Sequence, residues 1–357
     1  MLTLSSFERP RSIVLALGAA LCACGEAPLP PQEPAAVAAT ASGLYSVGDL
    51  RRAWPGRPCE ADSHREFDFW LGDWDVFNAS GAQVGTNRIE ALYDGCVIAE
   101  SWTDAGGGRG RSINAFDPDT GLWHQTWVSA NPVGIIRMAG VLEDGVLVMN
   151  GERAGQGFTI FDRYAWTELE PGVVEQRGKR TIPALGLDFP EFIGIYRPTD
   201  DFDPAPETPT TACQAGGPSE LSREGDFLVG EWSVAAETGP AIGTARIVTD
   251  LSGCLFEERF ETPKGLGAIA FTYYDYLSRA WFRTSIDSEG ERLELSGALA
   301  GGRLVLTGTE PGPGGRALTV RLTWEDLGDG RLRQRLETSP DGGASWRPGA
   351  ALIYTGA

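Results

Sequence analysis

The chain has 357 residues, with 30 Lys and Arg against 49 Asp and Glu and a formal net charge of −19 at pH 7. This length is ample for two domains of ordinary size. The acidic balance argues against a nucleic-acid partner, because binding to a phosphate backbone needs clustered positive charge.

Residues 1–24 have the pattern of a bacterial lipoprotein signal. Arg9 and Arg11 give a positively charged start, and an apolar run follows them. The sequence Leu-Cys-Ala-Cys-Gly over residues 21–25 resembles a lipobox, which implies cleavage before Cys24 and a lipid on its thiol. An ordinary secretory signal is the alternative. By the same resemblance, the absence of an Asp after Cys24 implies an outer-membrane address in a Gram-negative organism.

Residues 25–58 are rich in Ala and Pro and lack the apolar periodicity of a packed element, so we expect an extended tether. After the leader, no continuous apolar run approaches the roughly 18 residues that a membrane-spanning helix needs. The sequence therefore predicts an exported protein that is attached to the cell envelope through its lipid alone and faces the periplasm or the cell surface.

An opening motif at residues 67–76, Phe-Asp-Phe-Trp-Leu-Gly-Asp-Trp-Asp-Val, returns at residues 225–234 as Gly-Asp-Phe-Leu-Val-Gly-Glu-Trp-Ser-Val. The match continues along both halves at a constant separation of 158 residues, and such self-similarity indicates a duplicated unit. The paired landmarks include Cys96 and Cys254, Glu100 and Glu258, Trp123 and Trp281, Trp166 and Trp324, and Tyr196 and Tyr354. We expect a first domain over residues 59–198, a linker over 199–219 and a second domain over 220–357.

Four cysteines remain in the predicted mature chain beyond Cys24, an even number that favours disulfides in an oxidising setting. The repeat predicts the pairs Cys59–Cys96 and Cys213–Cys254, because Cys96 and Cys254 are equivalent and each remaining cysteine precedes its own copy of the opening motif. No metal site is expected, since the mature chain has no Cys-x-x-Cys and its only histidines are His64, expected at the surface, and His124.

Short segments rich in Val, Ile, Thr and aromatic residues alternate with Gly, Asp and Pro through both halves, and no stretch has a sustained helical period. Turn sequences such as Asp94-Gly95 and Glu143-Asp144-Gly145 lie between strand-like runs, so successive strands are expected to form hairpins. Antiparallel strands in this arrangement form either a sandwich or a closed barrel. The sequence thus predicts an all-β protein.

The Gly-acid-Trp step of each opening motif resembles the first-strand signature of lipocalin and calycin barrels. This resemblance implies two tandem up-and-down barrels, in which Trp74 and Trp232 close one end and a basic residue from a late strand stacks on each ring. Arg177 and Arg335 are the expected basic residues, with Arg197 as another candidate in the first copy. The first half also resembles a family of uncharacterised bacterial secreted proteins with the same Phe-Asp-Phe-Trp-Leu-Gly-x-Trp opening, which supports export and fold but implies no reaction.

Strand alternation places a carboxyl group between two large apolar side chains in each copy: Ile98, Glu100 and Trp102, and Phe256, Glu258 and Phe260. Such a group needs a partner, because an unpaired buried acid costs several kcal/mol. One interpretation places Glu100 and Glu258 in barrel lumens, with Arg88 and Arg246 as partners, where they orient the polar end of a ligand. The other is an ion pair with a purely structural role.

Trp123, Gln125 and Trp127 share one strand face, and the two indoles are either lumen wall or core plugs; Trp281 is the equivalent of Trp123. No cofactor is expected. The alternative is haem with His124 as an axial ligand, although the second copy has Phe282 at that position.

The sequence contains no Gly-x-Ser-x-Gly elbow, phosphate loop or dinucleotide fingerprint. The predicted function is therefore non-catalytic binding of a small apolar or amphiphilic ligand in a lumen, with Arg88, Glu100, Trp102, Trp123, Trp127, Arg246, Glu258 and Trp281 as candidate contacts. One alternative is an interaction module that binds an envelope protein or a glycan. Another is an isomerase or hydratase that uses Glu100 with Arg88 as an acid–base pair.

Overall fold

A computed structural model describes residues 59–130, 135–155, 157–311 and 317–357. The predicted signal over residues 1–24, with its acceptor Cys24, and the predicted tether over residues 25–58 lie outside the described residues.

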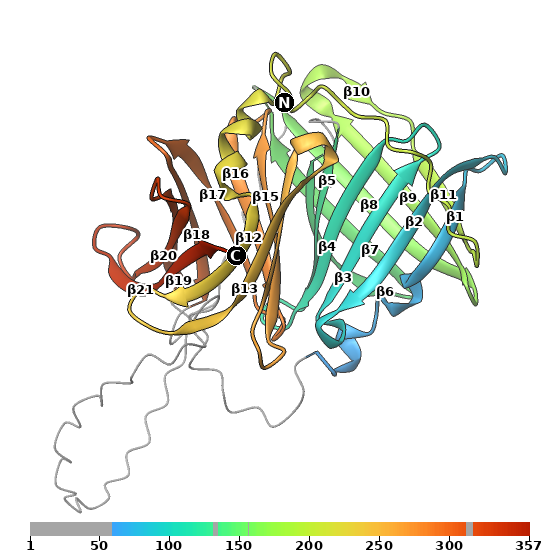
Figure 1. The fold of residues 1–357 in the computed structure, drawn as a ribbon. Helices are drawn as coiled ribbons and strands as arrows, with labels where there is room; N and C mark the ends of the chain where they lie inside the picture. The colour runs from blue at the N-terminus through green and yellow to red at the C-terminus, as the bar shows by residue number, and fades with distance from the viewer. Residues whose placement is uncertain (1–58, 131–134, 156, 312–316) are drawn as a thin grey trace, which may run out of the picture. The chain divides into compact units, whose positions relative to one another are not determined.

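The first half forms a closed antiparallel barrel of ten strands, with one short additional strand, β10, paired to β9 (Figure 1). Neighbours along the chain pair with one another from β1 to β9, and β11 closes the ring by pairing with both β9 and β1. The strands are β1 (Gly72–Phe77), β2 (Gln83–Leu92), β3 (Val97–Asp104), β4 (Arg109–Asp117), β5 (Leu122–Ser129), β6 (Ile136–Glu143), β7 (Val146–Ala154), β8 (Thr159–Glu170), β9 (Val173–Ile182), β10 (Leu187–Asp188) and β11 (Phe192–Pro198).

The second half repeats this architecture as a closed barrel of ten strands, with β21 pairing back onto β12. The strands are β12 (Gly230–Ala236), β13 (Ala241–Asp250), β14 (Leu255–Glu261), β15 (Gly267–Asp275), β16 (Ala280–Asp287), β17 (Arg292–Ala300), β18 (Arg303–Pro311), β19 (Ala317–Asp326), β20 (Arg331–Ser339) and β21 (Arg347–Gly356). The predicted all-β fold of two tandem antiparallel barrels is confirmed.

Hairpin turns join the strands where the sequence predicts them. Between β6 and β7, Asp144 and Gly145 both have positive φ, 50° and 79°, as a two-residue turn of type I′ requires. Closure leaves no long exposed strand edge, which removes the usual route to edge-to-edge aggregation.

The opening motif of each copy forms a 3₁₀ helix that leads into the first strand. These helices are η3 (Asp68–Trp70) and η7 (Glu220–Leu228). In both copies the first-strand indole donates back to this turn, Trp74 Nε1 to the carbonyl of Trp70 at 2.9 Å and Trp232 Nε1 to that of Leu228 at 3.1 Å. The repeated Trp thus fixes the angle at which the chain enters its barrel.

In the first barrel the same motif carries Phe67 and Trp70 into the interior, where both are fully buried. Their rings stack 4.8 Å apart, and Phe67 also meets Trp123 and Trp166 edge to face. Figure 1 shows this blue segment at the lower end of the first barrel. An aromatic plug therefore fills one end of the lumen.

The disulfides Cys59–Cys96 and Cys213–Cys254 are both present, with Cα atoms 5.1 and 5.2 Å apart, which confirms the predicted pairing. Each joins the incoming chain to the residue immediately before β3 or β14. Disulfides are typical of oxidising, exported environments. Among the described residues, no helix is both long and apolar enough to cross a bilayer.

A buried layer lies between the two barrels, and equivalent residues meet across it. The hydroxyls of Thr126 and Thr284 lie 3.0 Å apart. The sulfur of Cys96 lies 3.4 Å from the carbonyl oxygen of Ser288. In the equivalent contact, the sulfur of Cys254 lies 3.9 Å from the carbonyl oxygen of Ala130. Contacts between equivalent positions characterise a two-fold interface. The duplicated barrels are thus related by a pseudo-two-fold axis.

Apolar side chains from both halves fill this layer. They include Val97, Ile113, Ala115 and Val128 of the first barrel and Leu255, Ile269, Phe271, Tyr273, Phe282 and Ile286 of the second. Strand β15 is consequently buried at every position.

His64 was expected at the surface, and this prediction is wrong. It lies in the 3₁₀ helix η2 (Asp62–His64), is 8% exposed, and meets the ring of Phe116 edge to face at 5.1 Å. The Cys59–Cys96 disulfide nearby holds this segment against the barrel.

Candidate functional site

The lumen of the first barrel contains a cavity of about 210 Å³. Its wall combines aromatic, aliphatic and polar side chains with a single carboxyl group. The lining residues are Glu100, Trp102, Gln125, Trp127, Ile136, Met138, Tyr164, Gln176, Phe192 and Tyr196. Trp102, Trp127, Tyr164 and Phe192 are only partly buried, whereas the other six are buried. The wall thus combines four partly buried aromatic rings with buried polar groups, among them Glu100, Gln125 and Gln176.

Each of these four rings lies over a glycine. A Cβ at Gly85 would come within 2.6 Å of the Trp102 ring, and one at Gly110 within 2.2 Å of the Trp127 ring. Gly178 stands in the same relation to Tyr164, at 2.3 Å, and Gly194 to Phe192, at 3.0 Å. Because these positions carry no side chain, the rings lie flat against the wall and leave the centre of the lumen open.

Glu100 accepts hydrogen bonds on both carboxylate oxygens. Asn87 Nδ2 donates to Oε1 at 2.8 Å, and the hydroxyl of Ser112 donates to Oε2 at 2.6 Å. Behind Ser112, the Nδ2 of Asn114 donates to the Ser112 hydroxyl at 3.0 Å, and Gln125 Nε2 donates to Asn114 Oδ1 at 2.8 Å. A chain of neutral amides and a hydroxyl thus directs its dipoles at one buried carboxylate.

The groups around Glu100 offset only part of the effect that burial has on its pKa. Burial raises the pKa of Glu100 to about 7, and the hydrogen bonds from Ser112 and Asn87 together with the charge of Arg111 oppose this rise without cancelling it. Burial also raises the pKa of Tyr164 and of Tyr196, so both phenols are neutral at physiological pH. Glu100 is therefore the group of the lumen that changes charge near neutrality.

Glu100 should make the stability of the protein depend on pH. Its pKa is about 7 when folded, against an ordinary value of 4.5, so between these values the folded protein keeps a proton that the unfolded chain has lost. The free energy of unfolding should therefore fall as the pH rises from about 4.5 to about 7, by about 3 kcal/mol, and level off above. The Glu100→Gln variant should lack this fall.

Urea unfolding of both proteins at pH 5 and pH 8, without reductant, measures the difference. Asp287, whose pKa burial also raises to about 7, contributes equally to both proteins and cancels in the comparison. Equal pH dependence in the two proteins would show that Glu100 is not the titrating group.

Arg88 and Arg246 were predicted as partners of the two buried carboxylates, and this prediction is wrong. Arg88 pairs with Asp73 at 2.6 Å, and Arg246 pairs with Glu231 at 3.7 Å, on the exposed side of β2 and β13. The reason is strand alternation, since Asn87 and Ile89 are buried and Arg88 between them faces outward. The Glu100–Arg88 acid–base pair of the isomerase alternative is therefore not formed.

In the second barrel, Glu258 has a cationic partner that was not predicted. Arg283 Nη2 lies 2.7 Å from Glu258 Oε2, and both side chains are at most 4% exposed. The Tyr354 hydroxyl lies 3.2 Å from Glu258 Oε1, and Arg283 Nη1 donates to Thr272 at 2.9 Å. This arrangement is the buried ion pair that formed the structural alternative for Glu258.

Strand register makes Arg283 the counterpart of Gln125. Gln125 pairs with Met138 across β5 and β6, and Arg283 pairs with Leu295 across β16 and β17. The second-barrel counterparts of eight cavity residues are all buried: Glu258, Phe260, Arg283, Leu293, Leu295, Leu322, Gln334 and Tyr354. The two barrels thus share a fold but differ in their interiors.

The predicted tryptophans separate into two groups. Trp102 and Trp127 line the cavity. Trp123 packs against Phe67 and Phe116 in the plug, and Trp281 packs against Phe256 and Tyr274, so these two are core residues rather than cavity wall. Trp74 and Trp232 are likewise buried beside their 3₁₀ helices.

The expected stacking of Arg177, Arg197 or Arg335 on the first-strand indoles is not observed. Arg177 pairs with Glu175 and Glu191 on the outer face of the first barrel, and Arg197 is exposed. At the inward-facing position next to Arg177 the chain has Gln176, which accepts a hydrogen bond from the Tyr196 hydroxyl at 2.6 Å. Alternation again puts the arginines outside.

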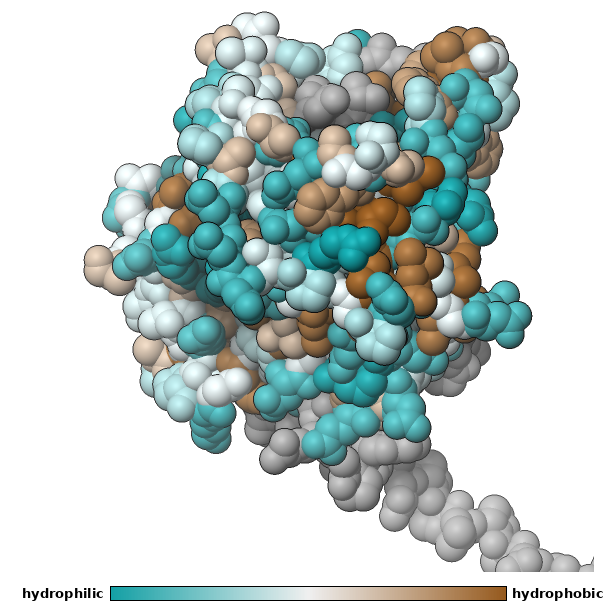
Figure 2. All heavy atoms as spheres, turned by 90° about the vertical axis from the view of Figure 1, so that its right-hand side faces the viewer, coloured by the Kyte–Doolittle hydropathy of each residue, from teal (hydrophilic) through white to brown (hydrophobic). Residues whose placement is uncertain are grey.

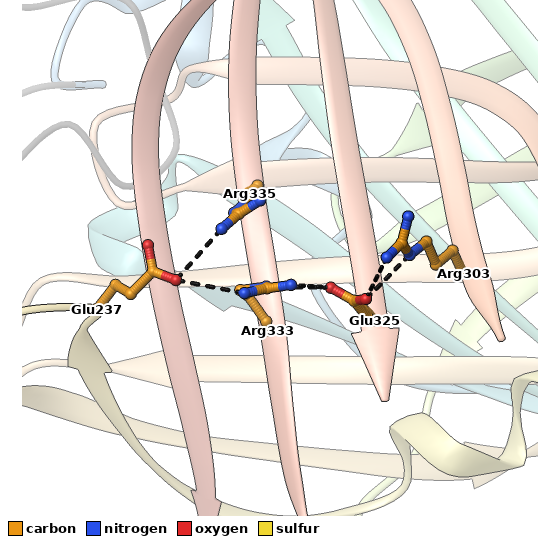
Figure 3. A network of polar contacts seen from close by, with 5 residues as sticks. All are labelled: Glu237, Arg303, Glu325, Arg333 and Arg335. Carbon is orange, nitrogen blue, oxygen red and sulfur yellow. Dashed lines mark hydrogen bonds and ion pairs between the residues drawn. The ribbon is translucent and has the colours of Figure 1, made fainter. Parts of the chain in front are cut away.

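Arg335 also points outward. Figure 3 shows it directed at Glu237, 3.3 Å away, in a chain of ion pairs that runs through Arg333 and Glu325 to Arg303. A surface hollow of about 330 Å³ lies over this network, lined by Arg303, Val305, Arg321, Thr323, Glu325, Arg333, Arg335 and Glu337. Exposed ion pairs of this kind contribute little individually but hold one another in a fixed arrangement.

His124 lies on the face of β5 that is turned away from the lumen. Its Nε2 is 3.4 Å from Arg292 of the second barrel and 3.8 Å from Asp117, and burial lowers the pKa of His124 to about 4. The imidazole is therefore neutral and belongs to the contact between the barrels. Within the described residues, no group of three or more His, Cys, Asp or Glu side chains is placed to hold a metal ion.

Several residues that line the cavity are not among the ligand contacts predicted from the sequence: Gln125, Ile136, Met138, Tyr164, Gln176, Phe192 and Tyr196. For Gln125, the alternation of side chains along the strand indicates an inward position, since this residue lies between Trp123 and Trp127 on their shared face. A polar residue in the middle of an inward-facing row indicates either a buried network or a ligand contact.

The fold and this site define a class: tandem closed antiparallel barrels, of which one has an open aromatic lumen with a buried carboxyl group. A scan against models of known protein families found no match for the chain, and a search of curated protein sequences found none either.

Proposed function

We propose that this protein binds a small amphiphilic molecule in the lumen of its first barrel and is held in the cell envelope by a lipid on Cys24. The observation that carries the proposal is the cavity of about 210 Å³, whose wall combines partly buried aromatic rings with a few buried polar groups. Ligand sites in proteins commonly combine an apolar wall with a few placed polar groups.

The size of the cavity limits the ligand. Sites for drug-sized molecules have volumes of roughly 300 to 1,000 Å³, so about 210 Å³ favours a compact molecule or the end group of a longer one. Glu100, Gln125 and Gln176 provide hydrogen-bonding groups for its polar part, while Trp102 and Trp127 pack against its apolar part.

The second barrel supports the first and does not bind a ligand in this proposal. Its corresponding side chains are buried, and its carboxylate is paired with Arg283. The lipoprotein signal, the outer-membrane address and the membership of the secreted family with the Phe-Asp-Phe-Trp-Leu-Gly-x-Trp opening belong to the same proposal. The two disulfides agree with export.

Native mass spectrometry of the full-length protein, purified from its host envelope in mild detergent, tests the proposal. The expected result is a low-mass adduct, one per chain. Met138→Trp, which adds bulk to the cavity wall, should abolish it. Gly110→Ala should weaken it, because the new Cβ pushes the Trp127 ring into the lumen. A bare protein mass, or an adduct unaffected by Met138→Trp in a folded variant, would contradict lumen binding.

A further inference from the structure

We propose that the ligand of the first barrel carries an organic cation, which binds against the carboxylate of Glu100. This inference rests on the proposed function and deepens it, because it names the chemical class of the ligand. The shared chemistry is a substituted ammonium or similar group, whether on a free small molecule or on a lipid headgroup.

The comparison between the two copies gives the first argument. In the second barrel the guanidinium of Arg283 lies 2.7 Å from Glu258 and 5.9 Å from the centre of the Trp324 ring, so a cation lies between a carboxylate and an indole. In the first barrel the carboxylate is retained as Glu100, the indole as Trp166, and Arg283 is replaced by the neutral Gln125. Among the described side chains, none forms an ion pair with Glu100.

The energetics of Glu100 give the second argument. Neutral hydrogen-bond donors stabilise the negative charge of a buried carboxylate only in part. A cation at hydrogen-bond distance supplies the rest of this stabilisation. In the second barrel, the side chain of Arg283 is that cation. The first barrel supplies Asn87 and Ser112 instead and leaves space in front of the carboxyl group, which lines the cavity.

The aromatic wall gives the third argument. Trp102, Trp127, Tyr164, Phe192 and Tyr196 line the cavity together with Glu100. Ring faces attract cations through their quadrupole, and a cage of aromatic rings is how proteins bind quaternary ammonium groups. The Met138 thioether adds a polarisable contact. A neutral apolar ligand would need the rings but would not need a buried carboxylate.

Other charged groups near the lumen do not substitute for such a cation. Arg111 of β4 pairs with Asp250 at 2.7 Å, on the side of the strand that faces the second barrel. Arg153 of β7 and Arg180 of β9 both bind Asp162 of β8, two residues along the strand from Tyr164, and none of the three lines the cavity. Tyr164 of β8 and Tyr196 of β11 remain neutral because burial raises their pKa.

Titration calorimetry of the full chain at pH 8 tests the inference with three probes: tetramethylammonium, choline and benzyltrimethylammonium. Each is compared with its neutral carbon isostere, for example 3,3-dimethylbutan-1-ol for choline. At least one cation should bind about tenfold or more tightly than its isostere. Its affinity should fall about tenfold at pH 6, where Glu100 is protonated, while the isostere shows no such change.

Two variants make the test specific. Glu100→Gln should remove the preference for the cation, so that the variant binds the cation and its isostere with similar affinity. Gln125→Arg should abolish cation binding, because it places a guanidinium where Arg283 lies in the second barrel. Retained near-ultraviolet circular dichroism shows that each variant is folded. Competition between choline and glycerophosphocholine, both water-soluble so that the lipid proposed on Cys24 plays no part, separates a free cation from a lipid headgroup as the source.

The outcomes separate this inference from the proposed function. If the isosteres bind as tightly as the cations, or if the native protein carries a neutral or anionic adduct, the cation inference fails and lumen binding stands. If no probe binds and the native protein carries no adduct, both fail.

Discussion

Replacing Arg283 with methionine should lower the free energy of unfolding by about 3 to 5 kcal/mol, because it leaves the buried carboxylate of Glu258 without its cation. Both side chains are at most 4% exposed, and their closest atoms are 2.7 Å apart. The aliphatic residues Leu293 and Leu295 of the same barrel can neither solvate nor neutralise the charge. The loss should be read from urea unfolding followed by far-ultraviolet circular dichroism.

Two controls identify the mechanism. Gln125→Met at the equivalent position of the first barrel removes only a neutral hydrogen bond to Asn114, and should cost about 1 kcal/mol. The double variant Arg283→Met with Glu258→Gln should recover most of the loss, because no buried charge remains. A double variant that recovers none of the loss would mean that lost packing, and not an unpaired buried charge, is responsible.

Trp70→Ala should destabilise the first barrel by about 3 to 5 kcal/mol, because it empties the centre of the aromatic plug. Trp70 is fully buried, stacks on Phe67 at 4.8 Å and contacts Trp166 at 5.7 Å. Its carbonyl also accepts the indole hydrogen bond of Trp74, which the substitution leaves in place.

The second barrel provides the matched comparison, since Leu228 occupies the position of Trp70 there. Trp70→Leu should therefore cost less than Trp70→Ala, because an aliphatic side chain is compatible with this turn and fills part of the space. Urea unfolding monitored by far-ultraviolet circular dichroism measures both. A loss below about 1 kcal/mol for Trp70→Ala would show that the plug is not a stabilising core.

The large-scale architecture was predictable because it depends on local and repeated signals. The 158-residue spacing identified the two copies, and the hairpin turns and alternating strands indicated antiparallel barrels. The disulfides followed from the equivalence of Cys96 and Cys254. None of these conclusions needed knowledge of which strands pair in which register.

The partners of the buried carboxylates were not predictable without register. Arg88 was selected by charge, but it has the opposite parity to Asn87, the residue that bonds Glu100. Arg283 was missed because its strand, β16, is buried on both faces, one in its own barrel and one against the other barrel, so alternation does not distinguish the two. Alternation likewise does not show that His124 faces the neighbouring barrel instead of the lumen.

The open cavity depends on features that have no signature in one strand alone. Gly110 permits the ring of Trp127 to lie flat only because β4 and β5 are neighbours.

Figure 2 shows the face of the molecule on the right of Figure 1, where apolar side chains gather among hydrophilic ones. Of the exposed large apolar residues, Leu185, Leu187 and Phe189 belong to the segment between β9 and β11, and the cavity residue Phe192 follows this segment as the first residue of β11. Such an exposed apolar segment was not visible in the strand pattern.

The central claim is that the lumen of the first barrel admits a ligand. The chain has three methionines, Met1, Met138 and Met149, of which Met138 lines the cavity and Met149 is fully buried in the core. Nuclear magnetic resonance of protein labelled with ¹³C at the methionine methyl groups, titrated with benzyltrimethylammonium or its carbon isostere, reports on both. We expect the Met138 signal to shift and saturate at one equivalent while Met149 stays unchanged. A Met138 signal that responds to neither probe, in a protein that also carries no native adduct, would contradict the claim.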